Sequence, residues 1–183
     1  NRQIAFGEDI LTRVFYSKDN AAALEEIRQA TLATFQEVLE GLEEKSGYPV
    51  ASCGAMTVAG NTTMMHFLLG LDAFGVFAAP YAPRAMRFDP YPARDLGLLL
   101  DGYVYCYPCR ANYLGGDIIS GLVATNLTRE SEICVFLDIG TNGELVVGNR
   151  EFLMAGAGAA GPALEGGVVK TGMRAVEGAV SYV

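Results

Sequence analysis

The sequence lacks most features that mark nucleic-acid-binding, membrane-bound and metal-binding proteins. It has one histidine, four cysteines, and 13 basic residues against 21 acidic ones, which gives a net charge of −8. This acidic balance argues against nucleic acid and anionic membrane surfaces as partners. The longest apolar stretch, 152–164, is too short and too rich in glycine to span a bilayer.

Several catalytic and cofactor motifs are also missing. The chain has no nucleophile elbow and no G-x-x-x-x-G-K-[ST] segment, which excludes the P-loop route to phosphate binding. His66 has no second histidine with which to share a metal, so we expect a packed or half-exposed histidine rather than a ligand. Cys106 and Cys109 have C-x-x-C spacing but lack a second pair, which favours structural cysteines over a zinc site. We therefore expect a reducing, cytoplasmic compartment.

The length and composition are those of a globular protein. With 183 residues, 51% of them hydrophobic, the chain can bury a core as one or two domains. No signal peptide opens the chain, and its first residue is Asn1 rather than Met, so we expect a fragment of a mature protein or an excised domain.

The pattern of apolar residues predicts alternating helices and strands. Apolar side chains at three- and four-residue steps predict a helix over 21–45. Its buried stripe would consist of Leu24, Ile27, Thr31, Phe35, Val38 and Leu42. Further helices are predicted at 63–71 and 118–127, strands at 50–59, 102–107 and 151–155, and an irregular surface excursion over 72–101. This order predicts an α/β fold with domains 1–130 and 131–183.

Residues 135–148 carry the most informative local pattern. An apolar run ends at Asp138, passes through Gly140, Thr141, Asn142 and Gly143, and then resumes. We expect a β-hairpin in which Asn-Gly supplies positive φ angles. Backbone amides and the threonine hydroxyl at its tip would suit phosphate oxygens, and the aspartate would reach a magnesium ion, often through water. The alternative is an ordinary exposed hairpin with a turn-forming aspartate.

Two further segments are candidates for function. Asp117 follows two glycines at a predicted helix start, where it serves either as an N-cap or as a general base or water-orienting carboxylate. Residues 156–161 match G-x-G-x-x-G, but no acidic residue stands at the expected distance downstream and no clear βαβ unit surrounds them. The glycines are better suited to letting backbone approach a ligand or a neighbouring helix, with Gly161 as a nucleotide-contacting candidate.

With these residues placed, the chain resembles the actin, sugar-kinase and heat-shock ATPase (ASKHA) superfamily. More closely, it resembles the ATPase region of the reductive activators of corrinoid proteins. The matching stretches are NRQIAFGEDILTR (1–13), GNTTMMHFLLGLD (60–72), YLGGDI (113–118), LDIGTNGEL (137–145) and AGPALEG (160–166). They are spread over nearly the whole chain and are specific as a set.

The resemblance implies a ribonuclease-H-like fold of two related α/β halves with nucleotide between them. The first D-x-G hairpin, expected before Asn1, and the adenosine-binding segment, expected after Val183, are missing, so the chain would be an incomplete fragment spanning parts of both halves. Asp117 corresponds to the helix that often carries the catalytic carboxylate. Gly60, Asn61 and Thr62 lie at a strand end facing the same cleft, for ligand binding or domain closure. The second phosphate hairpin corresponds to Asp138, Gly140, Thr141 and Asn142, with Gly143 beside them.

The resemblance also implies an activity. Such activators use ATP and magnesium to help a low-potential electron reach cob(II)alamin on a corrinoid partner protein. The electron arrives through an iron–sulfur domain, which would lie outside this chain because its four cysteines do not form a four-thiolate arrangement. The fragment alone is expected to be inactive, and its incomplete sheet favours association, for example as a homodimer. The alternatives are a small-molecule kinase, in which Asp117 deprotonates a substrate hydroxyl, and a non-catalytic module whose nucleotide-closed cleft presents a protein surface.

Overall fold

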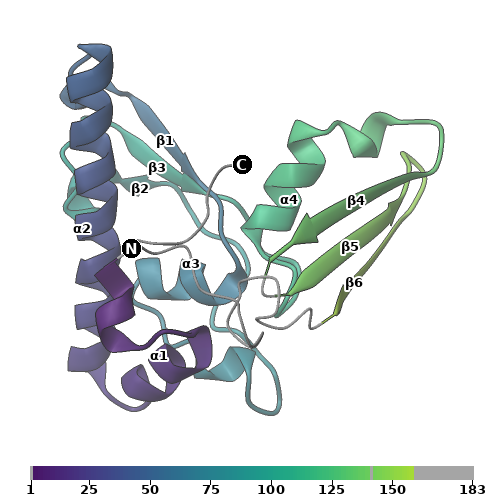
Figure 1. Cartoon of the computed structure of the whole chain (residues 1–183), viewed down its shortest axis with the longest axis horizontal. Helices are drawn as coiled ribbons and strands as arrows, with labels where there is room; N and C mark the ends of the chain where they lie inside the picture. Colours follow the sequence, from purple (N-terminus) through teal and green to yellow (C-terminus); the bar gives the residue numbers. More distant parts are fainter. Residues whose placement is uncertain (1, 141, 159–183) are drawn as a thin grey trace, which may run out of the picture. The chain divides into compact units, whose positions relative to one another are not determined.

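The computed structural model describes residues 2–140 and 142–158, and the chain divides into two units, 1–120 and 121–183. Helices and strands are mixed, as the α/β prediction requires (Figure 1). Among the described residues, each unit carries one three-stranded sheet. The predicted domain boundary near residue 130 stays a prediction.

The longest element is helix α2 (Ala21–Ser46), which agrees with the helix predicted over 21–45. The side chain of Asn20 caps its start by accepting a hydrogen bond from the Ala23 N–H over 3.1 Å. Gly47 ends it in the left-handed conformation, with φ of 73°. The main helical segments that pack against α2 are η1 (Arg2–Phe6), α1 (Ile10–Ser17) and α3 (Thr62–Leu68) (Figure 1).

The sheet of the first unit fixes the place of the candidate site. Strand β1 (Ala55–Val58) runs parallel to β3 (Tyr103–Cys106), and the two-residue β2 (Tyr91–Pro92) pairs antiparallel with the other edge of β3. Because β1 and β3 are parallel, the segments that leave their carboxyl ends begin at the same edge of the sheet. Ligands of open α/β sheets bind at such edges.

Two predictions for the first unit were partly wrong. The strand predicted over 50–59 begins only at Ala55, because Val50–Ser52 form a 3₁₀ turn, η2, closed by the Cys53 N–H bonding to the Val50 carbonyl over 2.9 Å. The segment 72–101 is irregular, with short turns η3 (Phe74–Val76) and η4 (Ala93–Leu96), but it is not only a surface excursion. It contributes Ala93, Leu96, Leu98 and Leu100 to the core that contains Val104.

The second unit contains the predicted hairpin. Strands β4 (Cys134–Ile139), β5 (Gly143–Gly148) and β6 (Leu153–Gly158) form an antiparallel meander. Strand β6 begins later than predicted because the N–H groups of Glu151 and Phe152 bond to the Asn149 side chain, which extends the preceding turn.

The helix predicted over 118–127 is α4 (Gly116–Ala124), followed by the turn η5 (Leu127–Arg129). It ends early because Asn126 takes a left-handed conformation, with φ of 55°. None of the described helices is both long and apolar enough to cross a membrane.

Candidate functional site

Two of the predicted site segments meet at the carboxyl ends of β1 and β3. The Asp117 N–H donates to the Gly60 carbonyl over 3.3 Å. A Cβ atom on Gly115 would lie 2.4 Å from the Asn61 Cα, and one on Gly116 would lie 2.9 Å from the Tyr107 Cβ. Such contacts leave no room for a side chain, so the two glycines are what allows the start of α4 to approach the β1–α3 connection.

Asp117 lies in the first turn of α4, as the sequence predicted. Its carboxylate accepts a hydrogen bond from the Ile118 N–H over 2.9 Å. A negative charge at this end of a helix also interacts favourably with the helix dipole. Asp117 is thus the second residue of the helix rather than its N-cap, and the general-base interpretation stays a prediction, because a carboxylate oriented by backbone can still accept a proton.

The side chains of the β1–α3 connection bond within the protein. Asn61 caps α3 by accepting a hydrogen bond from the Met64 N–H over 2.9 Å. Thr62 is completely buried, and its hydroxyl donates to the Ala111 carbonyl over 2.7 Å.

The two buried cysteines lie near the same corner. Burial raises the pKa of Cys106 to about 11. Burial also raises the pKa of Cys109, opposed by its interactions with the Thr62 side chain and the Gly116 N–H, and the charge of Asp117 raises it further. Both thiols are therefore protonated at neutral pH, as expected of structural cysteines. Cys109 is a neighbour of Asp117 that the sequence reasoning did not connect with the site.

The cysteines do not fit an iron–sulfur cluster held by this chain. Such clusters need convergent thiolates, whereas Cys53 is exposed and Cys106 and Cys109 are buried as thiols. Within residues 2–140 and 142–158, no three histidine, cysteine, aspartate or glutamate side chains gather in a way that could hold a metal ion.

The predicted phosphate hairpin differs from expectation in its turn. Ile139 pairs with Gly143, so residues 140–142 form the connection, and the Gly140 N–H donates to the Asn142 carbonyl over 2.8 Å. Gly143 is the first residue of β5, and its φ lies outside the left-handed region. The positive φ expected there was wrong, because the longer connection places Gly143 in the strand ladder. Thr141 lies outside the described residues.

The hairpin tip offers open backbone beside carboxylates. Among the residues that the structure describes, a Cβ on Gly140 would meet only the Asn142 carbonyl oxygen, at 3.8 Å, and one on Gly143 only the Gly158 oxygen, at 3.9 Å. Asp138 is half-buried, and Glu144 stands directly opposite it across the β4–β5 ladder. Magnesium is commonly bound by one or two carboxylates together with phosphate oxygens, so this donor set fits a magnesium–phosphate ligand.

Glu144 is a site candidate that the sequence reasoning missed. The missing step was the register of the hairpin. Counting outward from a connection at 140–142 pairs residue 139 with 143 and Asp138 with Glu144, which puts both carboxylates on one face.

Only part of the glycine run 156–161 lies within the residues that the structure describes. Gly156 and Gly158 lie within β6, where Gly158 pairs with Gly143. They are strand residues rather than a loop that opens a helix, which argues against a dinucleotide fingerprint. Gly161 lies outside the described residues.

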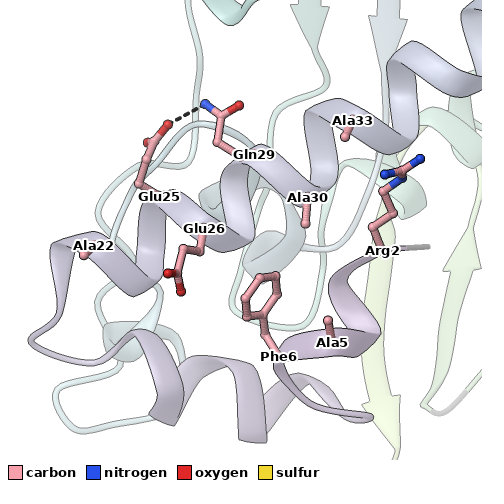
Figure 2. Close-up of a pocket in the computed structure, with 9 residues that line it drawn as sticks. All are labelled: Arg2, Ala5, Phe6, Ala22, Glu25, Glu26, Gln29, Ala30 and Ala33. Atoms are coloured by element: carbon pink, nitrogen blue, oxygen red, sulfur yellow. Dashed lines mark hydrogen bonds between the residues drawn. The ribbon is translucent and has the colours of Figure 1, made fainter.

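A shallow hollow elsewhere in the first unit does not coincide with these residues. Figure 2 shows it between η1 and α2, lined by Arg2, Ala5, Phe6, Ala22, Glu25, Glu26, Gln29, Ala30 and Ala33. Its polar side chains have protein partners. Glu25 accepts from Gln29 over 2.6 Å, and Glu26 accepts from the Tyr16 hydroxyl over 2.6 Å. We therefore assign it no ligand.

Comparison with known proteins covers the whole chain. The family model described as the RACo middle region matches residues 1–130, and the one described as the C-terminal domain of RACo, the ASKHA domain, matches residues 132–183. A curated relative, corrinoid activation enzyme RamQ of Eubacterium limosum, is 30% identical over 185 residues, covering 100% of this chain and 31% of the relative. A solved structure named reductive activator for corrinoid, iron-sulfur protein is 42% identical with a TM-score of 0.86, covering 98% of this chain and 29% of that one. The chain thus spans about a third of the length of these relatives.

Proposed function

Because the chain belongs to the family of the reductive activators of corrinoid proteins, we propose that it forms part of an ATP-dependent activator of this kind. ATP binding and hydrolysis would be coupled to electron transfer onto a corrinoid protein. The observation that carries the proposal is the match of 98% of the chain to a solved reductive activator, at 42% identity and a TM-score of 0.86. The iron–sulfur cluster would belong to a segment outside these 183 residues, because the cysteines here do not fit one.

The hairpin tip is the proposed phosphate site. Backbone amides of Gly140, Asn142 and Gly143, with the Thr141 hydroxyl, would hold phosphate oxygens. Asp138 would hold the magnesium ion through water, and magnesium would supply charge neutralisation for the phosphates. Support comes from the open backbone at Gly140 and Gly143 and from the paired carboxylates on the adjacent face. Gly161 is proposed as a further nucleotide contact.

Asp117 is the proposed catalytic carboxylate. It would orient the attacking water and accept its proton, as a carboxylate at a fixed backbone position can do. Gly60, Asn61 and Thr62 would lie at the edge of the same nucleotide cleft, which the bond between the Asp117 N–H and the Gly60 carbonyl supports.

We also propose a cytoplasmic location, a corrinoid protein rather than nucleic acid as partner, and the capacity to form a homodimer.

The test is Asp138→Ala in the full-length protein. We expect loss of magnesium-dependent ATP hydrolysis with the circular dichroism spectrum unchanged, because the residue supplies a ligand and contributes little to packing. Glu151→Ala is the matched control, since this exposed acidic residue lies in the β5–β6 turn, beyond the other end of β5. Wild-type turnover in Asp138→Ala would remove the hairpin from the mechanism.

The partner is tested separately. ATP hydrolysis by the full-length protein should rise when a cob(II)alamin-containing protein is added. Phosphorylation of a sugar or of acetate, without such stimulation, would replace the activator assignment with a small-molecule kinase.

A further inference from the structure

Thr62 lies close to the proposed catalytic carboxylate but cannot touch a ligand directly. It is 0% exposed, and its hydroxyl is already donated to the Ala111 carbonyl over 2.7 Å. The bond spans two segments that are distant in sequence, because it joins the start of α3 to the segment that leads from β3 into α4. The Thr62 hydroxyl can therefore affect a ligand only indirectly, by fixing the position of the segment that leads from β3 into α4.

The bonded carbonyl belongs to a tight turn immediately ahead of Asp117. The Arg110 N–H donates to the Leu114 carbonyl over 2.8 Å, and the Leu114 N–H donates back to Ala111 over 3.3 Å. Gly115 and Gly116 follow the turn and lie against Asn61 and Tyr107. A displacement of Ala111 is therefore transmitted to Asp117 over a short, closely packed stretch of backbone.

Cys109 fixes the same segment at its start. Its N–H donates to the Met86 carbonyl over 2.8 Å, and its side chain is buried. The start of α4 is thus held to the β1–α3 connection by the Thr62 hydroxyl and by the bond from the Asp117 N–H to the Gly60 carbonyl.

We propose that Thr62 is a positioning residue for Asp117. The inference rests on the proposed function, in which Asp117 orients the water that attacks ATP. The hydroxyl holds the 110–114 turn, the turn fixes the first residues of α4, and the carboxylate keeps the position from which it acts. Misplacing a catalytic group by about 1 Å lowers turnover by up to about 100-fold.

The test is Thr62→Val in the full-length protein, a substitution that keeps the shape of the side chain and removes the hydroxyl. We expect kcat for ATP hydrolysis to fall by roughly 10- to 100-fold, with the KM for ATP changed by less than about threefold. Thr62→Ser, which keeps the hydroxyl, should restore most of the rate. Thr63→Val is the matched control, because Thr63 is also buried in α3 but makes no hydrogen bond to residues 107–117.

A double-mutant cycle with Asp117→Asn separates positioning from general stability. If Thr62 acts through Asp117, then Thr62→Val should cause no further loss of kcat in the Asp117→Asn background. A normal kcat in Thr62→Val, or losses that multiply, would overturn the inference and leave the role of Asp117 intact. Full activity in Asp117→Asn would instead overturn the proposed role of Asp117 and the inference with it. If Thr62→Val does not fold, Thr62→Ala, which also removes the hydroxyl, enters the same cycle with the same expectations.

Discussion

At the scale of single residues, His66 is a structural group rather than a ligand. It is completely buried on α3, where its Nδ1 lies 2.7 Å from the Thr62 carbonyl oxygen and its Nε2 accepts from the Ala85 N–H over 3.3 Å. These partners assign the proton to Nδ1 of a neutral ring. The ring therefore ties α3 to the irregular segment 72–101, and the expectation of a packed histidine is confirmed.

This burial predicts a pH dependence of stability. Burial lowers the pKa of His66 below its ordinary value, outweighing the opposing effects of the Thr62 carbonyl and the charge of Asp72. Below about pH 6.5 the unfolded chain binds a proton that the folded chain does not, so stability is full above that pH. It should fall as the pH decreases toward the folded pKa, by at most about 1.4 kcal/mol per pH unit.

Because the chain has one histidine, a single imidazole signal can be followed by NMR titration. Urea unfolding of the 183-residue chain between about pH 7 and pH 5.5 measures the linked stability change. His66→Gln should flatten that dependence. An imidazole that titrates with an ordinary pKa would contradict the prediction.

At the scale of elements, α2 shows how a periodic pattern relates to burial. Ile27 and Val38 belong to the same predicted apolar stripe, yet Ile27 is 0% exposed and Val38 is 55% exposed. Ile27 packs in a cluster with Val14 and Phe67, whereas further along the helix Leu32, Phe35 and Leu39 pack against the other core cluster, to which Val38 does not belong. The stripe therefore contributes unequally to stability along the helix.

The two positions should respond differently to truncation. Ile27→Ala removes buried methyl groups and leaves a cavity, so the free energy of unfolding should fall by about 2–5 kcal/mol. Val38→Ala should change it by no more than about 0.5 kcal/mol, because the side chain is largely in water in both states. Urea unfolding of both variants measures the difference, and equal losses would show that the Val38 side chain is packed as tightly as that of Ile27.

The same contrast explains which elements were predictable from the sequence. Helix α2, strand β3 and the β4–β5 hairpin follow from local periodicity, caps and turn residues, and the structure confirms them. The burial of Leu98 and Leu100 and the pairing of Asp138 with Glu144 depend on tertiary contacts or on register. Local patterns specify which residues share a face, but they do not specify what the face contacts. This is also why Asp117 was identified as a candidate while its neighbour Cys109 was not connected to it.

At the scale of the whole molecule, the sheet of the second unit carries an exposed apolar face. Strand β4 pairs with β5, and β5 pairs with β6, so that alternate residues of the three strands share one face of the sheet. The large exposed side chains on it are Val135, Leu137, Ile139, Leu145 and Met154. The opposite face of the same sheet carries the buried Val146 and the half-buried Phe136. A contiguous apolar surface of this kind promotes association in water, in line with the sequence-based expectation of a self-associating fragment.

Leu137→Lys tests this expectation on the isolated 183-residue chain. The unmodified chain should form dimers or larger species as its concentration rises, measured by size-exclusion chromatography with light scattering. The new ammonium group would have to be desolvated in any contact made by the apolar face, so the substitution should shift the population toward monomer. Leu99→Lys is the matched control, because it introduces the same charge and removes a comparably exposed leucine from the first unit. A selective effect of Leu137→Lys would assign association to the β4–β6 face. Equal effects of the two substitutions would show that association does not depend on that face. A monomeric unmodified chain would contradict the expectation that the chain associates.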